Sequence, residues 1–194
     1  MPEIKQATRK TENPYVNLYE LETKDRVGHD KHYYVASRAK TAEDLKLSTH
    51  NEKPDGVIIY GLTPEKDKVL LVRQYRYALD RELIEIPAGK LEKGEDPLEA
   101  AKRELGEEAG LAAAEYRDLG YIIPTCGYCS EIIYLYAAKG LSPVGQHLDA
   151  DEFLSVFTLP LDKAAEMVLS GEITDSKTVA AVLKVKALRD AGRF

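Results

Sequence analysis

The chain of 194 residues has no tryptophan, two cysteines, two methionines and no apolar run that approaches the length of a membrane span. It also lacks a basic excess, because 33 acidic residues outnumber 27 basic ones and leave a formal net charge of -6. That balance argues against general nucleic-acid binding, which normally requires a basic face. No signal peptide is recognisable at the start. We therefore expect a cytoplasmic protein that binds neither nucleic acid nor membrane.

The two cysteines, Cys126 and Cys129, are separated by only two residues. Such a pair is compatible with redox chemistry or with half of a zinc site. A second cysteine pair is missing, and the spacing lies in a predicted loop between strands rather than at a strand-to-helix junction. We interpret the cysteines as reduced loop thiols.

The N-terminal part of the sequence predicts a β-hairpin ahead of the main domain. Residues 1–14 are polar, and residues 15–21 and 33–37 have the composition of strands. Two isolated strands are marginally stable and need a surface to pack on. We expect residues 1–50 to form this hairpin region, with a partner subunit of a homodimer as the packing surface, and residues 51–194 to form the main domain.

The remaining chain alternates predicted strands with predicted helices, which indicates an α/β sandwich with helices on both faces of a mixed sheet. A helix is expected over 161–170, ending at Gly171, and another beginning near Asp175 and Ser176. The strands are expected over residues 57–62, 69–75, 82–86, 115–123, 132–138 and 153–159.

The segment from Gly89 to Leu111, GKLEKGEDPLEAAKRELGEEAGL, contains the strongest local signals. Asp96 is suited to cap a helix, Pro97 suits its first position, and Glu99 lies where a capping-box partner sits. Apolar residues then recur at steps of three and four, as on one face of a helix. Glycine at position 110 predicts the end of that helix.

The acidic residues of this helix are placed where their charges lower its stability. Glu104, Glu107 and Glu108 project within an arc of roughly 100°, where like charges repel. The last two also lie in the final turn, where the helix dipole disfavours negative charge. Oxygen ligands gathered on one face are what Mg²⁺ or Mn²⁺ requires, and Arg103 is spaced to pair with Glu99 or Glu107. The alternative is a solvated acidic helix.

The full spacing resembles the signature of Nudix hydrolases. Its fixed positions are matched by Gly89, Glu95, Arg103-Glu104-Leu105, Glu107-Glu108 and Gly110-Leu111. The flanking sequence is similar to that of the ADP-ribose pyrophosphatase subgroup, at residues 73–77, 82–89, Pro124 and 171–178.

The resemblance implies a Nudix-type α/β/α sandwich and Mg²⁺-dependent hydrolysis of the pyrophosphate bond of ADP-ribose to AMP and ribose 5-phosphate. Mn²⁺ is an alternative cofactor. Two other functions stay open: hydrolysis of another nucleoside diphosphate sugar such as GDP-mannose, and a catalytically silent binding domain. Intact glutamates argue against the silent domain, since their repulsion would then serve no purpose.

The resemblance also implies roles for individual residues. The expected metal ligands are Glu104, Glu107, Glu108 and the carbonyl of Ala88, with Arg103 orienting them. Glu95 is expected to brace the turn, and Gly89 to give the backbone freedom where strand meets loop. A general base is expected in the acidic run 149–152, for which we favour Glu152.

For the substrate, Arg76 is the preferred contact, and Arg73 is a second candidate that points the other way on a regular strand. Glu85 and Glu131 are expected to bind ribose hydroxyls or adenine edges. Without tryptophan, base stacking falls to tyrosine or phenylalanine, with Tyr15 and Tyr19 as candidates. Arg38 is expected to reach a partner's site if the hairpin crosses a dimer interface.

Overall fold

The computed structural model describes residues 3–62, 68–148 and 152–194, and its contacts divide the chain into two units. Unit 1 comprises Met1–Asp55 and Ile123–Ile132, and unit 2 comprises Gly56–Ile122 and Ile133–Phe194. The division after residue 55 lies near the expected boundary at residue 50. Grouping of residues 123–132 with the N-terminal unit was not indicated by the sequence.

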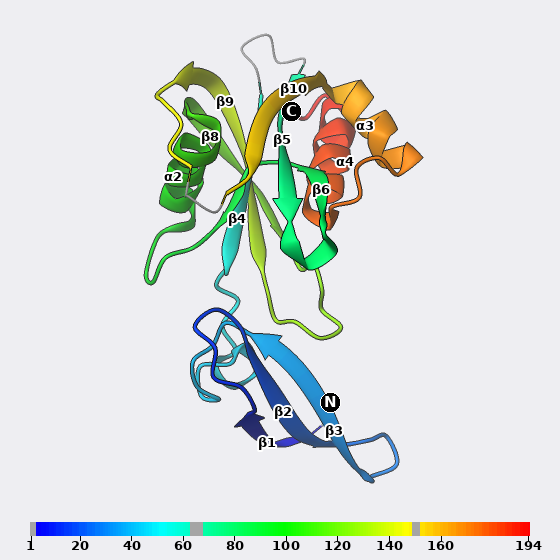
Figure 1. Cartoon of the computed structure of the whole chain (residues 1–194). Helices are drawn as coiled ribbons and strands as arrows, with labels where there is room; N and C mark the ends of the chain where they lie inside the picture. The colour runs from blue at the N-terminus through cyan, green and yellow to red at the C-terminus, as the bar shows by residue number, and fades with distance from the viewer. Residues whose placement is uncertain (1–2, 63–67, 149–151) are drawn as a thin grey trace. The chain divides into compact units, whose positions relative to one another are not determined.

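Unit 1 is built on a three-stranded antiparallel sheet in the order β1-β2-β3 (Figure 1). The strands are β1 (Ile4–Arg9), β2 (Asn17–Lys24) and β3 (Asp30–Ser37), and a short helix, α1 (Lys46–Thr49), follows. The expected hairpin corresponds to β2 and β3. The polar composition of residues 1–14 predicts no strand there, but β1 pairs along β2; most of its side chains stay exposed, so it shows no apolar alternation.

Unit 2 contains two sheets, with the strand orders β7-β4-β9-β8 and β10-β5-β6. The pair β4–β9 is parallel and the other described pairs of unit 2 are antiparallel, so the arrangement is mixed as expected. The bounds are β4 (Gly56–Gly61), β5 (Lys68–Arg76), β6 (Arg81–Glu85), β7 (Ala88–Lys90), β8 (Leu111–Ile122), β9 (Ile133–Pro143) and β10 (Leu154–Pro160), with a 3-10 turn, η1 (Tyr77–Leu79), between β5 and β6.

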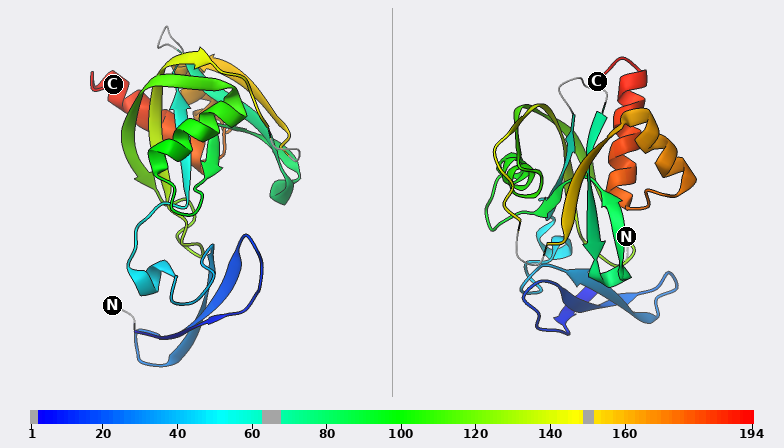
Figure 2. Two further views of the ribbon diagram at one scale, coloured as in Figure 1. Left: turned by 90° about the vertical axis from the view of Figure 1, so that its left-hand side faces the viewer. Right: turned by 45° about the horizontal axis from the view of Figure 1, so that its top comes forward.

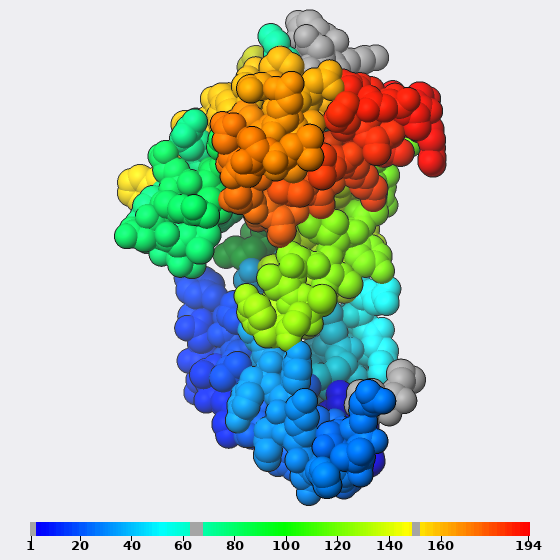
Figure 3. Space-filling model, turned by 90° about the vertical axis from the view of Figure 1, so that its right-hand side faces the viewer, coloured from blue at the N-terminus to red at the C-terminus, as the bar shows by residue number. Residues whose placement is uncertain are grey.

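Strand β4 shows how the layers are formed. Val57 and Ile59 pack in the cluster that includes residues of α2 (Pro97–Ala109). Ile58 and Tyr60 pack in the cluster of α3 (Leu161–Ser170) and α4 (Ser176–Asp190). Successive residues of a strand point to opposite faces, so helices cover both sides of unit 2 (Figures 1 and 2). Figure 3 views the face formed by α3 and α4. The α/β/α sandwich is confirmed.

Helix α2 begins and ends where the sequence predicts. The Asp96 side chain accepts hydrogen bonds from the backbone N–H groups of Leu98 at 2.9 Å and Glu99 at 3.4 Å. Gly110 ends the helix with a φ of 66°, a left-handed conformation that glycine adopts without strain. The Glu99 carboxylate pairs with Lys102 at 2.6 Å, and it is not seen in the predicted capping-box contact.

The pair β8–β9 is longer than the apolar segments that predicted it. Strand β8 starts at Leu111 directly after α2, and β9 continues to Pro143. Backbone hydrogen bonding needs no apolar side chain, which is why composition started the first strand too late and ended the second too early. Within the described residues, no helix is long and apolar enough to cross a membrane.

Candidate active site

The acidic segment forms a corner in unit 2, in which β7 runs beside β4 and a turn over residues 91–96 leads into α2. Glu95 fixes this turn, because its carboxylate accepts the backbone N–H of Glu92 at 2.8 Å and two hydrogen bonds from Arg103. The hydrogen bonds of Arg103 lower the pKa of Glu95 and so favour its charged form. The bracing role expected of Glu95 matches this geometry.

Arg103 joins the turn to the glutamates of α2. Its Nε and Nη2 lie 3.0 and 3.1 Å from the two carboxylate oxygens of Glu95, and Nη2 also reaches the carbonyl of Lys90 at 3.0 Å. Its Nη1 donates to Glu104 and to Glu107, both at 2.9 Å. One planar guanidinium therefore positions three carboxylates, a task that suits the fixed fork of arginine.

Glu104 and Glu108 are the buried members of the cluster. Their exposed fractions are 9% and 2%, and the backbone N–H of Ala88 donates to Glu108 at 2.9 Å. Burial raises the pKa of Glu104, and it raises the pKa of Glu108 to about 8, with the neighbouring charges of Glu104 and Glu152 adding to the effect. Such carboxylates are costly unless a cation compensates them.

Gly89 leaves the space that Glu104 occupies. A Cβ atom built on Gly89 would lie 1.7 Å from Cδ of Glu104 and 1.8 Å from its Oε1. Gly89 is not among the described residues with positive φ. The expectation that glycine is needed here for backbone freedom was therefore wrong: the position needs a residue without a side chain.

A divalent cation fits this corner by the chemistry of its donors. Two buried carboxylates and the more exposed Glu107 lie on one helix beside it, with Glu104 and Glu107 linked through Arg103, and carboxylates are oxygen donors of the type that Mg²⁺ prefers. Within residues 3–62, 68–148 and 152–194, no three acidic, histidine or cysteine side chains are already arranged as a ligand set. Arg103 and the Ala88 N–H hold the carboxylates instead.

Next to this corner, Arg76 at the end of β5 is held by Glu85 at the end of β6. Both carboxylate oxygens of Glu85 accept hydrogen bonds from Arg76 at 2.6 Å. Lys177 lies 3.3 Å from the same carboxylate. Glu85 is thus placed differently from the expected ribose or adenine contact, because its oxygens are committed to buried ion pairs.

Glu152, which precedes β10, interacts electrostatically with both buried glutamates: its negative charge raises the pKa of Glu104 and of Glu108. That proximity is consistent with the position expected of a general base. Asp149 and Asp151, the other acids of the run, lie outside the described residues.

The other predicted substrate residues have contacts outside this cluster. Arg73 stacks over Phe157 at 5.9 Å and pairs with Glu82 at 4.0 Å. Being three residues from Arg76 on the same strand, it points to the opposite face of β5. Arg38 and Glu131 form an ion pair within unit 1 at 3.1 Å. Tyr15, also in unit 1, is exposed, whereas Tyr19 is buried and its hydroxyl donates to the carbonyl of Ala39.

Sequence reasoning missed the part that α4 plays near the site. Asp175 was predicted only as a helix cap, and no role was expected for Lys177. The two ionisable residues flank a predicted helix start in a segment, 171–178, that already resembled the subgroup. Paired charges at that position were the available signal.

Comparisons with known proteins agree on one family. The NUDIX domain matches residues 52–182. A methanol dehydrogenase activator of Bacillus methanolicus is 45% identical and an ADP-ribose pyrophosphatase of Bacillus subtilis (strain 168) is 39% identical, each over 131 residues that cover 66% of this chain and 70% of the relative. A GDP-mannose pyrophosphatase of Salmonella paratyphi B is 36% identical, covering 63% of this chain and 68% of its own.

The crystal structure of an ADP compounds hydrolase superposes on this chain with a TM-score of 0.80. The superposition covers 100% of this chain and 97% of the other, at 21% sequence identity. At that identity the likeness shows a common fold.

Proposed function

This chain belongs to the Nudix family and is a pyrophosphohydrolase, and we propose that its substrate is ADP-ribose, which it cleaves to AMP and ribose 5-phosphate. The observation that carries the proposal is the buried pair Glu104 and Glu108, held beside β7 by Arg103 and Ala88. The ADP-ribose pyrophosphatase of Bacillus subtilis, 39% identical, supports the choice of substrate.

In the proposed reaction, a divalent cation would be held by Glu104, Glu107, Glu108 and the carbonyl of Ala88. When bound, that cation neutralises pyrophosphate oxygens and favours attack by water. Arg103 keeps the carboxylates aimed at one point through its hydrogen bonds. Such supporting contacts orient metal ligands and tune their affinity.

The chain also supplies groups for the water and the phosphates. Glu152 takes the proton of the attacking water, whose oxygen bonds to one phosphorus as the bridging P–O bond breaks. Arg76 contacts phosphate oxygens, because its guanidinium lies close enough to Glu108 for the two charges to interact. Contacts of the substrate with Arg73, Arg38, Glu131 and Tyr15 stay predictions.

A substrate panel with Mg²⁺ tests the proposal. Purified protein is assayed against ADP-ribose, GDP-mannose and other nucleoside diphosphate sugars, with phosphate release measured after phosphatase coupling. ADP-ribose is expected to have the highest kcat/KM. A higher value for GDP-mannose would favour the second candidate, which the GDP-mannose pyrophosphatase of Salmonella supports. No turnover of any member would contradict the proposed activity.

We propose Mg²⁺ as the physiological cation and Mn²⁺ as a substitute, since the expected ligands are hard oxygens. Chelation with EDTA is expected to abolish turnover, and titration with each cation separately measures the preference. If Mn²⁺ restores turnover after EDTA treatment and Mg²⁺ does not, the assignment of Mg²⁺ as the physiological cation is contradicted.

We further propose that the protein is a cytoplasmic homodimer, with unit 1 contributing to the interface. Unit 1 exposes several large apolar side chains, which in a monomer would remain in water: Ile4, Tyr15, Val16, Leu18, Val27, Tyr33 and Tyr34. Light scattering after size exclusion is expected to give twice the chain mass of 21.6 kDa. Cell fractionation tests the compartment.

A further inference from the structure

Glu85 is an almost fully buried carboxylate that lies between two cations. Only 1% of its side chain is exposed. Its Oε1 and Oε2 accept hydrogen bonds from Nε and Nη2 of Arg76, each at 2.6 Å. The ammonium of Lys177 lies 3.3 Å from Oε2, the oxygen that also receives Nη2. One carboxylate therefore couples a cation of β5 to a cation of α4.

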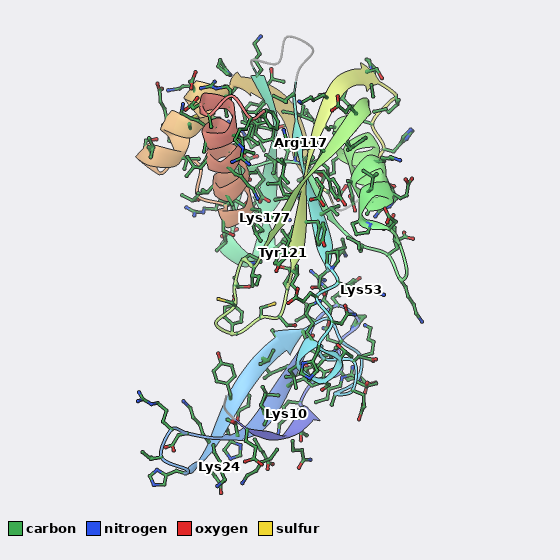
Figure 4. All side chains as sticks on the ribbon, turned by 180° about the vertical axis from the view of Figure 1, so that it is seen from behind. Lys10, Lys24, Lys53, Arg117, Tyr121 and Lys177 are labelled. Atoms are coloured by element: carbon green, nitrogen blue, oxygen red, sulfur yellow. The ribbon has the colours of Figure 1, made fainter. Side chains whose placement is uncertain are left out.

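Lys177 is itself held by the N-terminal end of α4. Asp175, the N-cap residue, binds the Lys177 ammonium through Oδ1. The other oxygen of Asp175 accepts from the backbone N–H of Thr178 at 2.9 Å and from its hydroxyl at 2.8 Å. The Thr178 hydroxyl in turn accepts the backbone N–H of Ile86, next to Glu85, at 3.0 Å. Figure 4 labels Lys177 at this end of α4.

This network of Asp175, Lys177, Glu85 and Arg76 contains two cations and two carboxylates, and Arg76 is its most exposed member. The side chain of Arg76 is 37% exposed, compared with 18% for Lys177 and 9% for Asp175. Within the described residues, Nη1 of Arg76 makes no hydrogen bond, whereas Nε and Nη2 are held by Glu85. The guanidinium can thus offer one edge to a ligand oxygen while the opposite edge is fixed.

Arg76 is also close to the proposed metal corner through its partner. Glu85, which binds Arg76, precedes Ala88 on the same short stretch of chain, and the backbone N–H of Ala88 donates to Glu108 at 2.9 Å. A phosphate oxygen placed between Arg76 and Glu108 would be near both the metal ligands and the guanidinium. The orientation of Arg76 therefore matters for any pyrophosphate bound there.

We propose that Lys177 is a positioning residue for this reaction: by sharing the Glu85 carboxylate with Arg76, it fixes the guanidinium that contacts a substrate phosphate. The inference rests on the proposed function. Lys177 acts through Arg76 and not by touching substrate, because its ammonium is already engaged by two buried carboxylates.

Removal of the Lys177 charge has two consequences in this network. Asp175 and Glu85 are left with Arg76 as their shared cation, so the guanidinium is drawn toward Asp175 and away from its present position. The Glu85 carboxylate also loses its second cation, the Lys177 ammonium. Glu85 can then rotate, and Arg76 can pair with it in more than one geometry. Both effects misplace the phosphate contact.

Steady-state kinetics of the full-length Lys177→Met variant with ADP-ribose and Mg²⁺ test the proposal. We expect kcat/KM to fall by about tenfold or more, the loss typical of removing a supporting partner. Lys177→Arg, which keeps the charge, is expected to recover most of that loss. Should the methionine variant fail to fold, Lys177→Gln is measured in the same way. Wild-type kcat/KM in a folded variant that lacks the charge would overturn the proposal.

Lys184→Met is the matched control. It removes a second lysine charge from α4 and weakens the docking of that helix, because the Lys184 ammonium donates to the backbone carbonyl of Leu119. We expect a lower Tm with kcat/KM within about twofold of wild type, since a merely structural change acts through the folded fraction. If Lys184→Met reproduces the kinetic loss of Lys177→Met, Lys177 has only a structural role and the proposal fails.

A double-mutant cycle identifies the route of action. Arg76→Lys removes the guanidinium fork but keeps a positive charge beside Glu85. If Lys177 acts through Arg76, adding Lys177→Met to this variant should change kcat/KM little further. If the losses of kcat/KM in the two single variants combine in full in the double variant, the two residues act independently and the proposal is overturned. An inactive wild-type protein would refute the proposed function, whereas an active wild type with an equally active Lys177→Met refutes this inference alone.

Discussion

Replacing Gly89 with alanine tests whether the position of Glu104 is essential. The added Cβ would lie 1.7 Å from Cδ of Glu104, and ordinary van der Waals contact begins at 3.4 Å. The carboxyl must therefore move by about 1.7 Å or more, a distance obtained from these two values. The backbone at Gly89 is not in the left-handed region, so alanine is tolerated by the strand itself.

The expected result is a folded enzyme with little activity. Displacement of a catalytic group by about 1 Å can cost 100-fold in rate, so we expect kcat/KM for ADP-ribose to fall by at least about 100-fold, equivalent to about 2.7 kcal/mol. The Mg²⁺ concentration for half-maximal activity should rise as well, since one expected ligand no longer reaches the cation.

The assay pairs initial rates over a Mg²⁺ titration with thermal unfolding of the same preparations. Gly106→Ala is the matched control, because Gly106 lies in the same signature, within α2, and an added Cβ there meets nothing within 4 Å. This control should retain wild-type kinetics. Its free energy of unfolding should rise by about 0.5–1 kcal/mol, the usual advantage of alanine over glycine inside a helix. Wild-type kcat/KM and Mg²⁺ dependence in Gly89→Ala would refute the reasoning.

Three further predictions concern the charged side chains. Glu108→Gln should reduce kcat by more than about 100-fold, because loss of a ligand exceeds the 10–100-fold cost of losing its support, while circular dichroism stays that of the wild type. Arg103→Lys should raise the Mg²⁺ requirement by about 10-fold or more, since an ammonium cannot reproduce the fork to Glu95; an unchanged requirement would exclude the bracing role. Hydrogen bonds from Arg189 and Lys186 lower the pKa of Asp162 to about 2. The stabilisation by ionised Asp162 is therefore present above its ordinary pKa of 3.8 and is lost as the pH falls through about 2. Asp162→Asn should make Tm depend less on pH at the acid end, and a Tm-against-pH curve identical to that of the wild type would count against the pairing.

The acidic helix could be predicted from the sequence because its signals are local. Asp96, Pro97 and Gly110 define the ends of α2 within a few residues of the chain, and the structure places them as expected. The pairing of Arg103 with Glu107 also follows from a spacing of four residues within one helix.

Contacts between distant segments could not be predicted in this way. Glu85 and Lys177 meet only because β6 and α4 pack together, and nothing in either segment alone indicates the ion pair. The steric role of Gly89 likewise depends on where α2 places a glutamate relative to β7. Strand β1 was missed because an exposed edge strand needs no apolar pattern.

The division of the chain into two units has a consequence for the order of synthesis. The polypeptide leaves unit 1 after Asp55 and returns to it only for residues 123–132. Two residues of that returning segment, Tyr128 and Ser130, form backbone hydrogen bonds with Ala36 of β3. During translation the N-terminal unit therefore stays incomplete until the first half of unit 2 has been made. A fragment cut after residue 55 would keep the sheet β1-β2-β3 but lack these partners of β3.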